Sequence, residues 1–173
     1  HSLGFGPVNG LVMGTRSGDI DQSVIFYLIE ELGHTAKEVK QILMEESGML
    51  GLTGYSDLRE IERLAQDGDQ TCIMALRINA LRIKKYIGAY AALMNGLDAV
   101  IFTAGIGENS DIMRALVCEE MDYLGIKLDE DKNAVRAKKI TEIHAKGAKT
   151  KVLIIPTDEE IEIALQSYQL LIS

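Results

Sequence analysis

Residues 99–109, Ala-Val-Ile-Phe-Thr-Ala-Gly-Ile-Gly-Glu-Asn, carry the clearest signal of fold class in this sequence. The apolar run from Ala99 to Thr103 is rich in β-forming residues, as expected of a short strand that is buried on both faces. Gly105-Ile106-Gly107 then ends the strand in a turn, and Asn109 or Ser110 caps a following helix. The stretch therefore predicts a strand, a glycine turn and a helix in succession.

The same order recurs towards the other end of the chain. Lys151 to Ile155 is predicted as a second buried strand, which a proline stops, and a helix follows from Thr157. Two strands that each lead into a helix predict an α/β fold. Two strands alone form a poor sheet, so we expect further strands upstream of His1. Between the two strands, residues 125–128 are predicted as a short edge strand and the lysine-rich residues 134–150 as a surface excursion.

The rest of the sequence is mostly helical. Thr35, with Glu38 three residues later, forms a capping box. Gly48, Gly51 and Gly54 predict a turn. The longest predicted helix has apolar residues spaced alternately three and four apart, which makes one continuous apolar seam. The predicted helices span residues 21–32, 35–47, 57–66 and 69–94.

The composition of the 173 residues is that of an ordinary globular protein, with 47% hydrophobic and 25% charged residues. The net charge of −8 argues against a nucleic-acid ligand, because a phosphate backbone requires a cationic face. No apolar run reaches the ~20 residues of a membrane span, and residues 1–10 lack the charged-then-apolar order of a signal peptide. Cys72 and Cys118 lack metal-ligand spacing, and we interpret them as buried, reduced thiols of a cytoplasmic protein rather than as a disulfide.

The first motif that could carry chemistry is residues 10–21, Gly-Leu-Val-Met-Gly-Thr-Arg-Ser-Gly-Asp-Ile-Asp. Arg16 lies between two glycines, so its backbone can approach a ligand closely. A guanidinium is always charged and aims its forked donors at phosphate or carboxylate oxygens, as phosphoryl transfer requires. Spacing alone favours a simpler interpretation, in which Arg16 caps a turn by pairing with Asp19 or Asp21.

The second motif is the glycine turn at Gly105-Ile106-Gly107. Ligands of open α/β sheets bind beyond the carboxyl ends of the strands, and glycine lets a nucleotide rest on bare backbone. A dinucleotide fingerprint would require a third glycine where this chain has Ser110, which argues against an oxidoreductase. A structural turn capped by Asn109 is an equal alternative.

Two further motifs have structural interpretations beside the functional ones. Thr157 and Glu160 have capping-box spacing, and acids in a first helical turn complement the helix dipole. A carboxylate at the tip of a buried strand could equally hold Mg2+ through water, although the structural interpretation is favoured. In residues 55–59, Tyr-Ser-Asp-Leu-Arg, Asp57 is a good N-cap and Arg59 could reach a ribose or a phosphate.

The order of these motifs is more informative than any one of them. Met-Gly-Thr-Arg-Ser-Gly-Asp-Ile-Asp (13–21), Ser-Asp-Leu-Arg (56–59), Ile-Phe-Thr-Ala-Gly-Ile-Gly-Glu-Asn (101–109) and Ile-Ile-Pro-Thr-Asp-Glu-Glu (154–160) together resemble the C-terminal half of acetate and propionate kinases. The resemblance covers nearly the whole chain. It implies an α/β, ribonuclease H-like second lobe of the fold shared by acetate and sugar kinases and actin-type ATPases. Residues 1–173 would then be a partial, helix-rich C-terminal nucleotide-binding lobe, truncated at its N-terminal strands.

The resemblance also implies a role for each motif. Arg16 would stabilise the phosphoryl group in flight, Gly14 would line the nucleotide cleft beside it, and Glu159 would be the Mg2+-associated glutamate. Asp158 departs from the family pattern, where asparagine is common, so the metal role is carried to Glu159 only. Nucleotide contacts are implied for Asp57, Leu58, Arg59, Gly105, Ile106, Gly107, Glu108 and Asn109.

The implied activity is the reversible transfer of the γ-phosphate of ATP to acetate, giving acetyl phosphate and ADP, with ATP/ADP and Mg2+ bound in an intact homodimeric enzyme. The family's first lobe and its phosphate-binding hairpin have no counterpart in this sequence, so the chain alone is expected to be inactive. Two alternatives remain open: a propionate kinase, and a non-catalytic helical dimerisation module whose glycine turns are structural.

Overall fold

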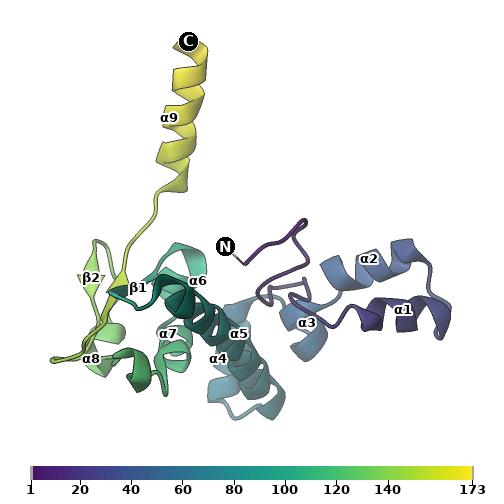
Figure 1. The fold of residues 1–173 in the computed structure, drawn as a ribbon, viewed down its shortest axis with the longest axis horizontal. Coiled ribbons are helices and arrows are strands. Elements are labelled where there is room, and N and C mark those ends of the chain that lie inside the picture. Colours follow the sequence, from purple (N-terminus) through teal and green to yellow (C-terminus); the bar gives the residue numbers. More distant parts are fainter. Residues whose placement is uncertain (1, 173) are drawn as a thin grey trace. The chain divides into compact units, whose positions relative to one another are not determined.

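The computed structural model describes residues 2–172, apart from the side chain of Glu159. The chain divides into two compact units, residues 1–93 and 94–173 (Figure 1). The first unit contains α1 (Ser23–Glu30), α2 (Ala36–Glu45), α3 (Gly48–Thr53), α4 (Leu58–Gln66) and nearly all of α5 (Gln70–Met94). The second unit contains β1 (Ala99–Phe102), α6 (Ala104–Asn109), α7 (Asp111–Cys118), a 3-10 turn (Asp122–Leu124), α8 (Glu130–Asn133), β2 (Thr141–Glu142), β3 (Lys151–Ile154) and α9 (Glu159–Ile172).

Local capping signals set the starts of α2, α4 and α7, as predicted. The hydroxyl of Thr35 accepts a hydrogen bond from the backbone N–H of Glu38, whose carboxylate accepts one from the N–H of Thr35 at 2.7 Å. Asp57 caps α4, and Ser110, rather than Asn109, caps α7. Each cap satisfies N–H groups that the first turn of a helix leaves without a partner.

The glycine-rich turn predicted for residues 48–54 is wrong, because residues 48–53 form the short helix α3. The two N–H groups that follow Gly48 donate to the carbonyls of Met13 and Gly14 at 2.9 and 2.8 Å. Glycine disfavours helix by its own propensity. Hydrogen bonds to a segment far away in sequence offset that preference here.

The core of the first unit collects on α4 and α5. Ile61 of α4 is fully buried, and the N-terminal half of α5 contributes the buried residues Cys72, Ala75, Leu76, Asn79 and Ala80. The apolar seam predicted along α5 is buried at Leu76 and Ala80, whereas its last residue, Met94, is 61% exposed. Cys72 and Cys118 are both buried, and neither forms a disulfide within the described residues, as predicted.

The second unit is built on a three-stranded sheet in the order β1–β3–β2. β1 and β3 are parallel, with Ala99 opposite Lys151 and Phe102 opposite Ile154, and β2 is antiparallel to β3. The α/β prediction is therefore confirmed. Because parallel strands in register end at the same edge, the segments that follow β1 and β3 leave the sheet side by side.

Three expectations about this unit need correction. β1 is not buried on both faces, since Ile101 is 53% exposed. The lysine-rich segment is more than a surface excursion, because it contains β2 and the fully buried Ile143. Residues 125–128 pair only through an isolated bridge between Leu128 and His144. The strand β2 was missed because Ile143 is the only buried apolar residue in the lysine-rich segment, and one apolar side chain is too weak a pattern to predict a strand.

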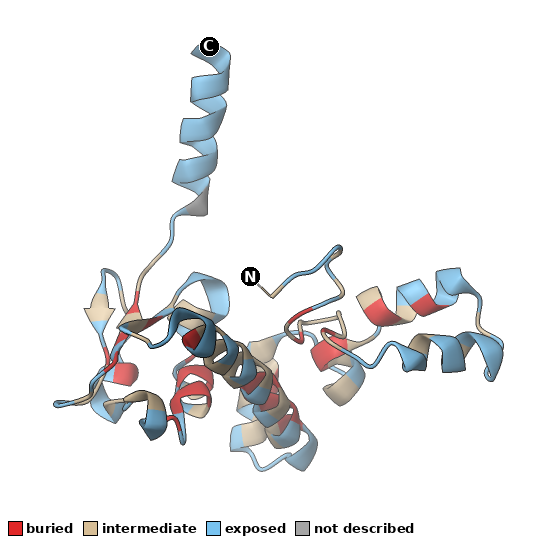
Figure 2. Ribbon diagram, in the orientation of Figure 1, coloured by how far each residue is buried: buried red, intermediate tan, exposed pale blue. Residues whose placement is uncertain are grey.

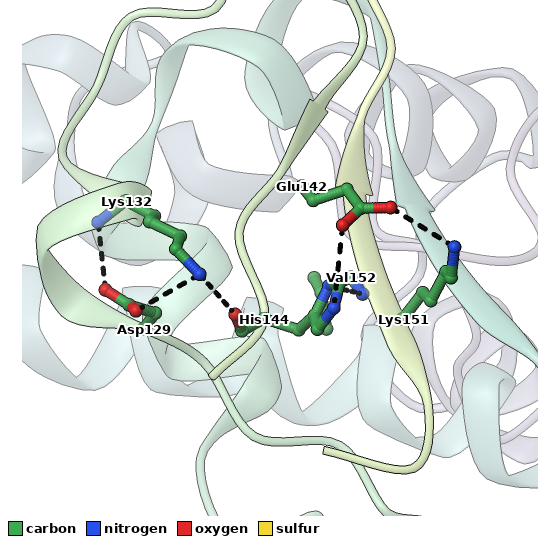
Figure 3. A network of polar contacts seen from close by, with 6 residues as sticks. All are labelled: Asp129, Lys132, Glu142, His144, Lys151 and Val152. Carbon is green, nitrogen blue, oxygen red and sulfur yellow. Dashed lines mark hydrogen bonds and ion pairs between the residues drawn. The ribbon is translucent and has the colours of Figure 1, made fainter. Parts of the chain in front are cut away.

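A polar network lies over the pairing of β2 with β3. Figure 3 shows its members: Asp129, Lys132, Glu142, His144, Lys151 and Val152. Glu142 lies 3.2 Å from the ammonium of Lys151, and the Nδ1 atom of His144 accepts from the N–H of Val152 at 3.4 Å. The ion-paired side chains of Glu142 and Lys151 are more than half exposed, so this pair adds little stability.

The capping box predicted from Thr157 and Glu160 is wrong. α9 begins at Glu159, so Asp158 occupies the N-cap and accepts a hydrogen bond from the N–H of Ile161 at 3.0 Å. Every described side chain of α9 is exposed (Figure 2).

Candidate functional site

Arg16 lies in a loop whose two ends are bonded together. The N–H of Asp19 donates to the carbonyl of Gly10 at 2.8 Å, and the N–H of Gly10 donates to the Asp19 carboxylate at 2.7 Å. The Arg16 guanidinium donates to the carbonyl of Pro7 at 3.3 Å. A carbonyl is neutral, so this bond does not neutralise the positive charge of the guanidinium, and no described carboxylate forms an ion pair with it.

The interpretation of Arg16 as a turn cap paired with an aspartate is wrong. The Asp19 carboxylate is engaged by Gly10 and by the hydroxyl of Tyr86 at 2.7 Å, and these bonds, chiefly that of Tyr86, hold the pKa of Asp19 below its usual value. Asp21 accepts from the N–H and the hydroxyl of Ser23 at the start of α1. Within residues 2–172 no ion pair joins Arg16 to a carboxylate.

Gly14 brings the Arg16 loop next to the segment that begins α4. A Cβ atom at Gly14 would lie 3.2 Å from the carbonyl oxygen of Ser56. The next residue, Asp57, caps α4, and Leu58 is the first, half-buried residue of that helix. The structure therefore places Gly14 beside the segment that leads into Asp57, Leu58 and Arg59.

Asp57 and Arg59 bind each other. Two nitrogens of the Arg59 guanidinium donate to the Asp57 carboxylate, the shorter bond being 2.6 Å. The Arg59 guanidinium, together with the Arg59 N–H, lowers the pKa of Asp57. The Asp57 carboxylate raises the pKa of Arg59. Because the Arg59 side chain is 90% exposed, the pair contributes little to stability, and Arg59 can exchange its carboxylate for another anion at small cost.

In the second unit, two motifs meet at the carboxyl edge of the sheet. The N–H of Ile155 donates to the carbonyl of Phe102 at 3.0 Å, and the hydroxyl of Thr103 donates to the carbonyl of Ile155 at 2.8 Å. Ala104 then takes a left-handed φ of 57°, a strained conformation for a residue with a side chain. The backbone thus turns sharply where β1 ends.

The turn predicted at Gly105–Gly107 is instead part of the helix α6. Gly107 packs on the end of β1, where a Cβ atom would lie 3.1 Å from the carbonyl carbon of Phe102. At Gly105, no described atom beyond its chain neighbours and the backbone of α6 lies within 4 Å of the corresponding position. Ile106 is 49% exposed, and the Asn109 amide donates to the carbonyl of Gly105 at 2.8 Å. One glycine serves packing, and the other leaves open backbone.

Glu108 connects the two motifs of this unit. One of its carboxylate oxygens accepts from both the N–H and the hydroxyl of Thr157 at 2.9 Å, which lowers the pKa of Glu108. An open pocket of about 360 Å³ is lined by Ala104, Gly105, Glu108, Thr157, Asp158 and Glu160. Among the predicted site residues, Gly105 and Glu108 therefore line a common pocket.

Arg114 supports this site and escaped the sequence analysis. It is only 2% exposed, and it donates to the carbonyls of Gly107 and Glu108 at 2.9 and 3.0 Å. It also donates to the side chain of Asn133 at 2.7 Å. The sequence offered one signal for this role. Arg114 falls among the inward-facing residues of the amphipathic helix α7, beside Met113, and a buried charge needs polar partners.

The pocket carries oxygen donors that fit Mg2+. Glu108, Asp158 and Glu160 are carboxylates, and Mg2+ binds proteins through one or two carboxylates while keeping water or phosphate oxygens. Among the described side chains, no three His, Cys, Asp or Glu residues cluster as a ready-made metal cage. Glu159, the predicted metal residue, is the first residue of α9, and its side chain lies outside the described residues.

Comparison with known proteins finds relatives of one family. Residues 1–165 match the model of the acetokinase family. An acetate kinase of Flavobacterium johnsoniae is 61% identical over 170 residues, which are 98% of this chain and 43% of that protein. The crystal structure of Porphyromonas gingivalis acetate kinase has a TM-score of 0.90 and 43% identity, over 98% of this chain and 43% of that one. A propionate kinase structure from Francisella tularensis has a TM-score of 0.87 and 39% identity, over 94% and 41% of the two chains.

These comparisons confirm the predicted fold class, since the matching structures are acetate and propionate kinases. The chain spans less than half of the length of the relatives that it matches. No helix within residues 2–172 has both the length and the apolar content needed to cross a bilayer.

Proposed function

The chain belongs to the acetokinase family, and from that premise we propose that it is the nucleotide-binding C-terminal lobe of a phosphotransferase. In the intact enzyme, meaning the full-length protein that contains this chain, a carboxylate oxygen of acetate attacks the γ-phosphorus of ATP in line. The bond from that phosphorus to the ADP oxygen breaks, so the products are acetyl phosphate and ADP. Propionate is the alternative substrate.

The uncompensated charge of Arg16 is the observation that carries this proposal. Its backbone is held in a closed loop, and its guanidinium faces a carbonyl rather than a carboxylate. Phosphoryl transfer develops charge on the oxygens of the transferred group, and donors aimed at those oxygens lower the barrier. A guanidinium already neutralised by Asp19 or Asp21 would be poorly suited to that task.

The nucleotide contacts are proposed from both units. In the first unit, the exposed guanidinium of Arg59 is available for a ribose or a phosphate, with Gly14 nearby. In the second unit, the open backbone at Gly105 and the exposed Ile106 suit the adenosine. The segment 105–109 would contact the nucleotide as a short helix, which corrects the expectation of a turn.

Acyl phosphate formation by the intact enzyme tests the proposed function. With ATP and Mg2+, we expect acetate to give a product that hydroxylamine traps as a hydroxamate, and we expect stoichiometric ADP. Comparing kcat/KM for acetate and propionate decides between the two substrates. Absence of a trapped acyl phosphate with either acid would contradict the proposal.

The main rival is a non-catalytic helical dimerisation module. It predicts that ATP has no effect on hydrogen exchange, whereas a nucleotide-binding lobe predicts slower exchange in residues 103–109. Exposed apolar residues on α1 and α9 suit such a module, but the uncompensated Arg16 charge has no role in it. A dinucleotide-binding oxidoreductase is disfavoured by Ser110, and binding of a nicotinamide cofactor would revive it.

Mg2+, when bound, would neutralise charge on the phosphates, and we propose that Glu159 helps to hold it through water. Glu159→Gln in the intact enzyme should raise the Mg2+ concentration needed for the half-maximal rate and leave the unfolding midpoint nearly unchanged. Glu162→Gln is the control, because Glu162 lies on the same helix and its carboxylate accepts a hydrogen bond from the side chain of Gln166. If both variants need the same Mg2+ concentration as the wild type, Glu159 is simply an acid in the first turn of α9.

The intact enzyme is also proposed to be a homodimer that pairs through helical surface on this lobe. α1 has no buried residue, and Phe26 and Tyr27 are 60% and 56% exposed. Phe26→Ser should therefore shift the mass measured by light scattering towards the monomer. Leu171→Ser, on the exposed α9, is the matched control. A wild-type monomer at micromolar concentration would contradict the dimer, and a response to Leu171→Ser alone would move the interface to α9.

The proposed partners are limited to small molecules and a second copy of the chain. A net charge of −8 disfavours nucleic acid. Cys72 and Cys118 are buried and are not joined to each other in a disulfide, which supports a reducing, cytoplasmic location.

A further inference from the structure

The residues on both sides of Arg16 are held by backbone hydrogen bonds to the end of α2 and to the segment that joins α2 to α3. The N–H of Ser17 donates to the carbonyl of Leu43, and the carbonyl of Thr15 accepts from the N–H of Ser47, both at 3.0 Å. Two further bonds, from the start of α3, reach the carbonyls of residues 13 and 14. The peptide that carries Arg16 is therefore fixed on both sides.

Gly48 lies close against the backbone of residues 13 and 16. It is buried and has a φ of 64°. A Cβ atom there would collide with the carbonyl oxygen of Met13 and would lie 2.7 Å from the carbonyl oxygen of Arg16 and 3.0 Å from its nitrogen. All three are backbone atoms, which cannot rotate away as a flexible side chain can. A side chain at position 48 would therefore displace the backbone of Arg16.

Asp19 closes the same loop from the other side and ties it to α5. Its carboxylate accepts from Gly10 and Asn9 at 2.7 Å, and its second oxygen accepts from the hydroxyl of Tyr86 at 2.7 Å. Tyr86 belongs to α5, which contributes more buried residues than any other helix described in this unit. The loop is thus anchored to a rigid element at the end opposite to Gly48.

We propose that Gly48 and Asp19 are positioning residues that hold Arg16 in its productive place. In this proposal, Gly48 and Asp19 do not touch the substrate; they act through Arg16. The inference rests on the proposed function, because it needs Arg16 to act on the phosphoryl group. Displacing a catalytic group by about 1 Å can lower the rate by about 100-fold.

Gly48→Ala in the intact enzyme tests whether the close packing of Gly48 on the backbone of Arg16 matters for the rate. We expect kcat to fall by about 10-fold or more, with a small change in the KM for ATP. Gly33→Ala is the matched control, because Gly33 has a similar φ of 74° but no atom within 4 Å of its Cβ position. It carries the same backbone strain without the collision, so its kcat should stay near that of the wild type.

Tyr86→Phe tests the role of Asp19, because it removes only the hydroxyl that donates a hydrogen bond to the Asp19 carboxylate. We expect kcat to fall by about 2- to 10-fold, the range that loss of one hydrogen bond gives. Tyr90→Phe is the control, since its ring lies 6.1 Å from that of Tyr86 on the same helix. This milder pair keeps the inference testable if Gly48→Ala does not fold.

Combination with Arg16→Ala separates positioning from general stability. If Gly48 and Tyr86 act through Arg16, each substitution should lower kcat in the wild type and have almost no further effect when Arg16 is already alanine. Full, additive losses in that background would contradict the inference and indicate a structural role. If Arg16→Ala itself leaves kcat unchanged, the proposed function of Arg16 fails instead, which is a separate result.

Discussion

Replacing Arg16 with alanine in the intact enzyme is expected to lower kcat by about 100-fold or more and to change the KM for ATP much less. The reason is that the guanidinium of Arg16 is charged and remains available to phosphate oxygens. Arg16 donates to the carbonyl of Pro7, so it is not committed to a carboxylate in the described chain. An interaction that strengthens in the transition state raises kcat, whereas one that is equally strong in the ground state affects KM.

Steady-state kinetics with ATP as the varied substrate measure this split. Arg63→Ala is the matched control, since Arg63 lies on α4 and forms exposed ion pairs with Glu60 and Asp67. Exposed pairs contribute about 0–1 kcal/mol to stability, so this variant should keep nearly full activity. A rise in KM at unchanged kcat would make Arg16 a ground-state contact of the nucleotide.

The chain of 173 residues by itself is expected to show no measurable turnover. Of the catalytic groups that the family resemblance implies, this sequence supplies Arg16. The carboxylate-binding arginine, the catalytic aspartate and the phosphate-contacting histidine have no counterpart in it. Catalysis of phosphoryl transfer depends on positioning and charge stabilisation together, so one such group cannot sustain the reaction.

A coupled assay of ADP formation with the purified chain makes this measurement. The chain with Arg16→Ala controls for contaminating kinases of the expression host, and the intact enzyme is the positive control. Turnover by the chain that disappears in the Arg16→Ala variant would show that the assignment of catalytic groups is wrong.

The signals that predicted local structure correctly act over a few residues. Thr35 and Glu38 close a capping box within one turn, and Asp57 accepts from an N–H two residues away. The strand predicted at residues 99–103 is present as β1, although its second face is exposed. Such interactions depend on neighbours in the chain, so the sequence displays them directly.

The assignments that failed depended on residues far apart in the chain. Glycines at 48–54 and 105–107 indicated turns, yet both segments are short helices, because other segments supply their hydrogen bonds and packing. Thr157 had the spacing for a capping box with Glu160 but is bound by Glu108, 49 residues earlier. No local pattern contains that partner.

The sequence by itself determined the family, through the order of its motifs, and it identified Arg16 as a candidate that either caps a turn or acts on phosphate. Only the tertiary structure showed that Asp19 and Asp21 have other partners, which removes the turn cap as an explanation of Arg16. In the folded chain, the Asp19 carboxylate accepts hydrogen bonds from Gly10 and Tyr86, and Gly48 packs against the backbone of Arg16. A charge is free for chemistry only when its neighbours in space bind other groups, and which residues become neighbours is decided by folding.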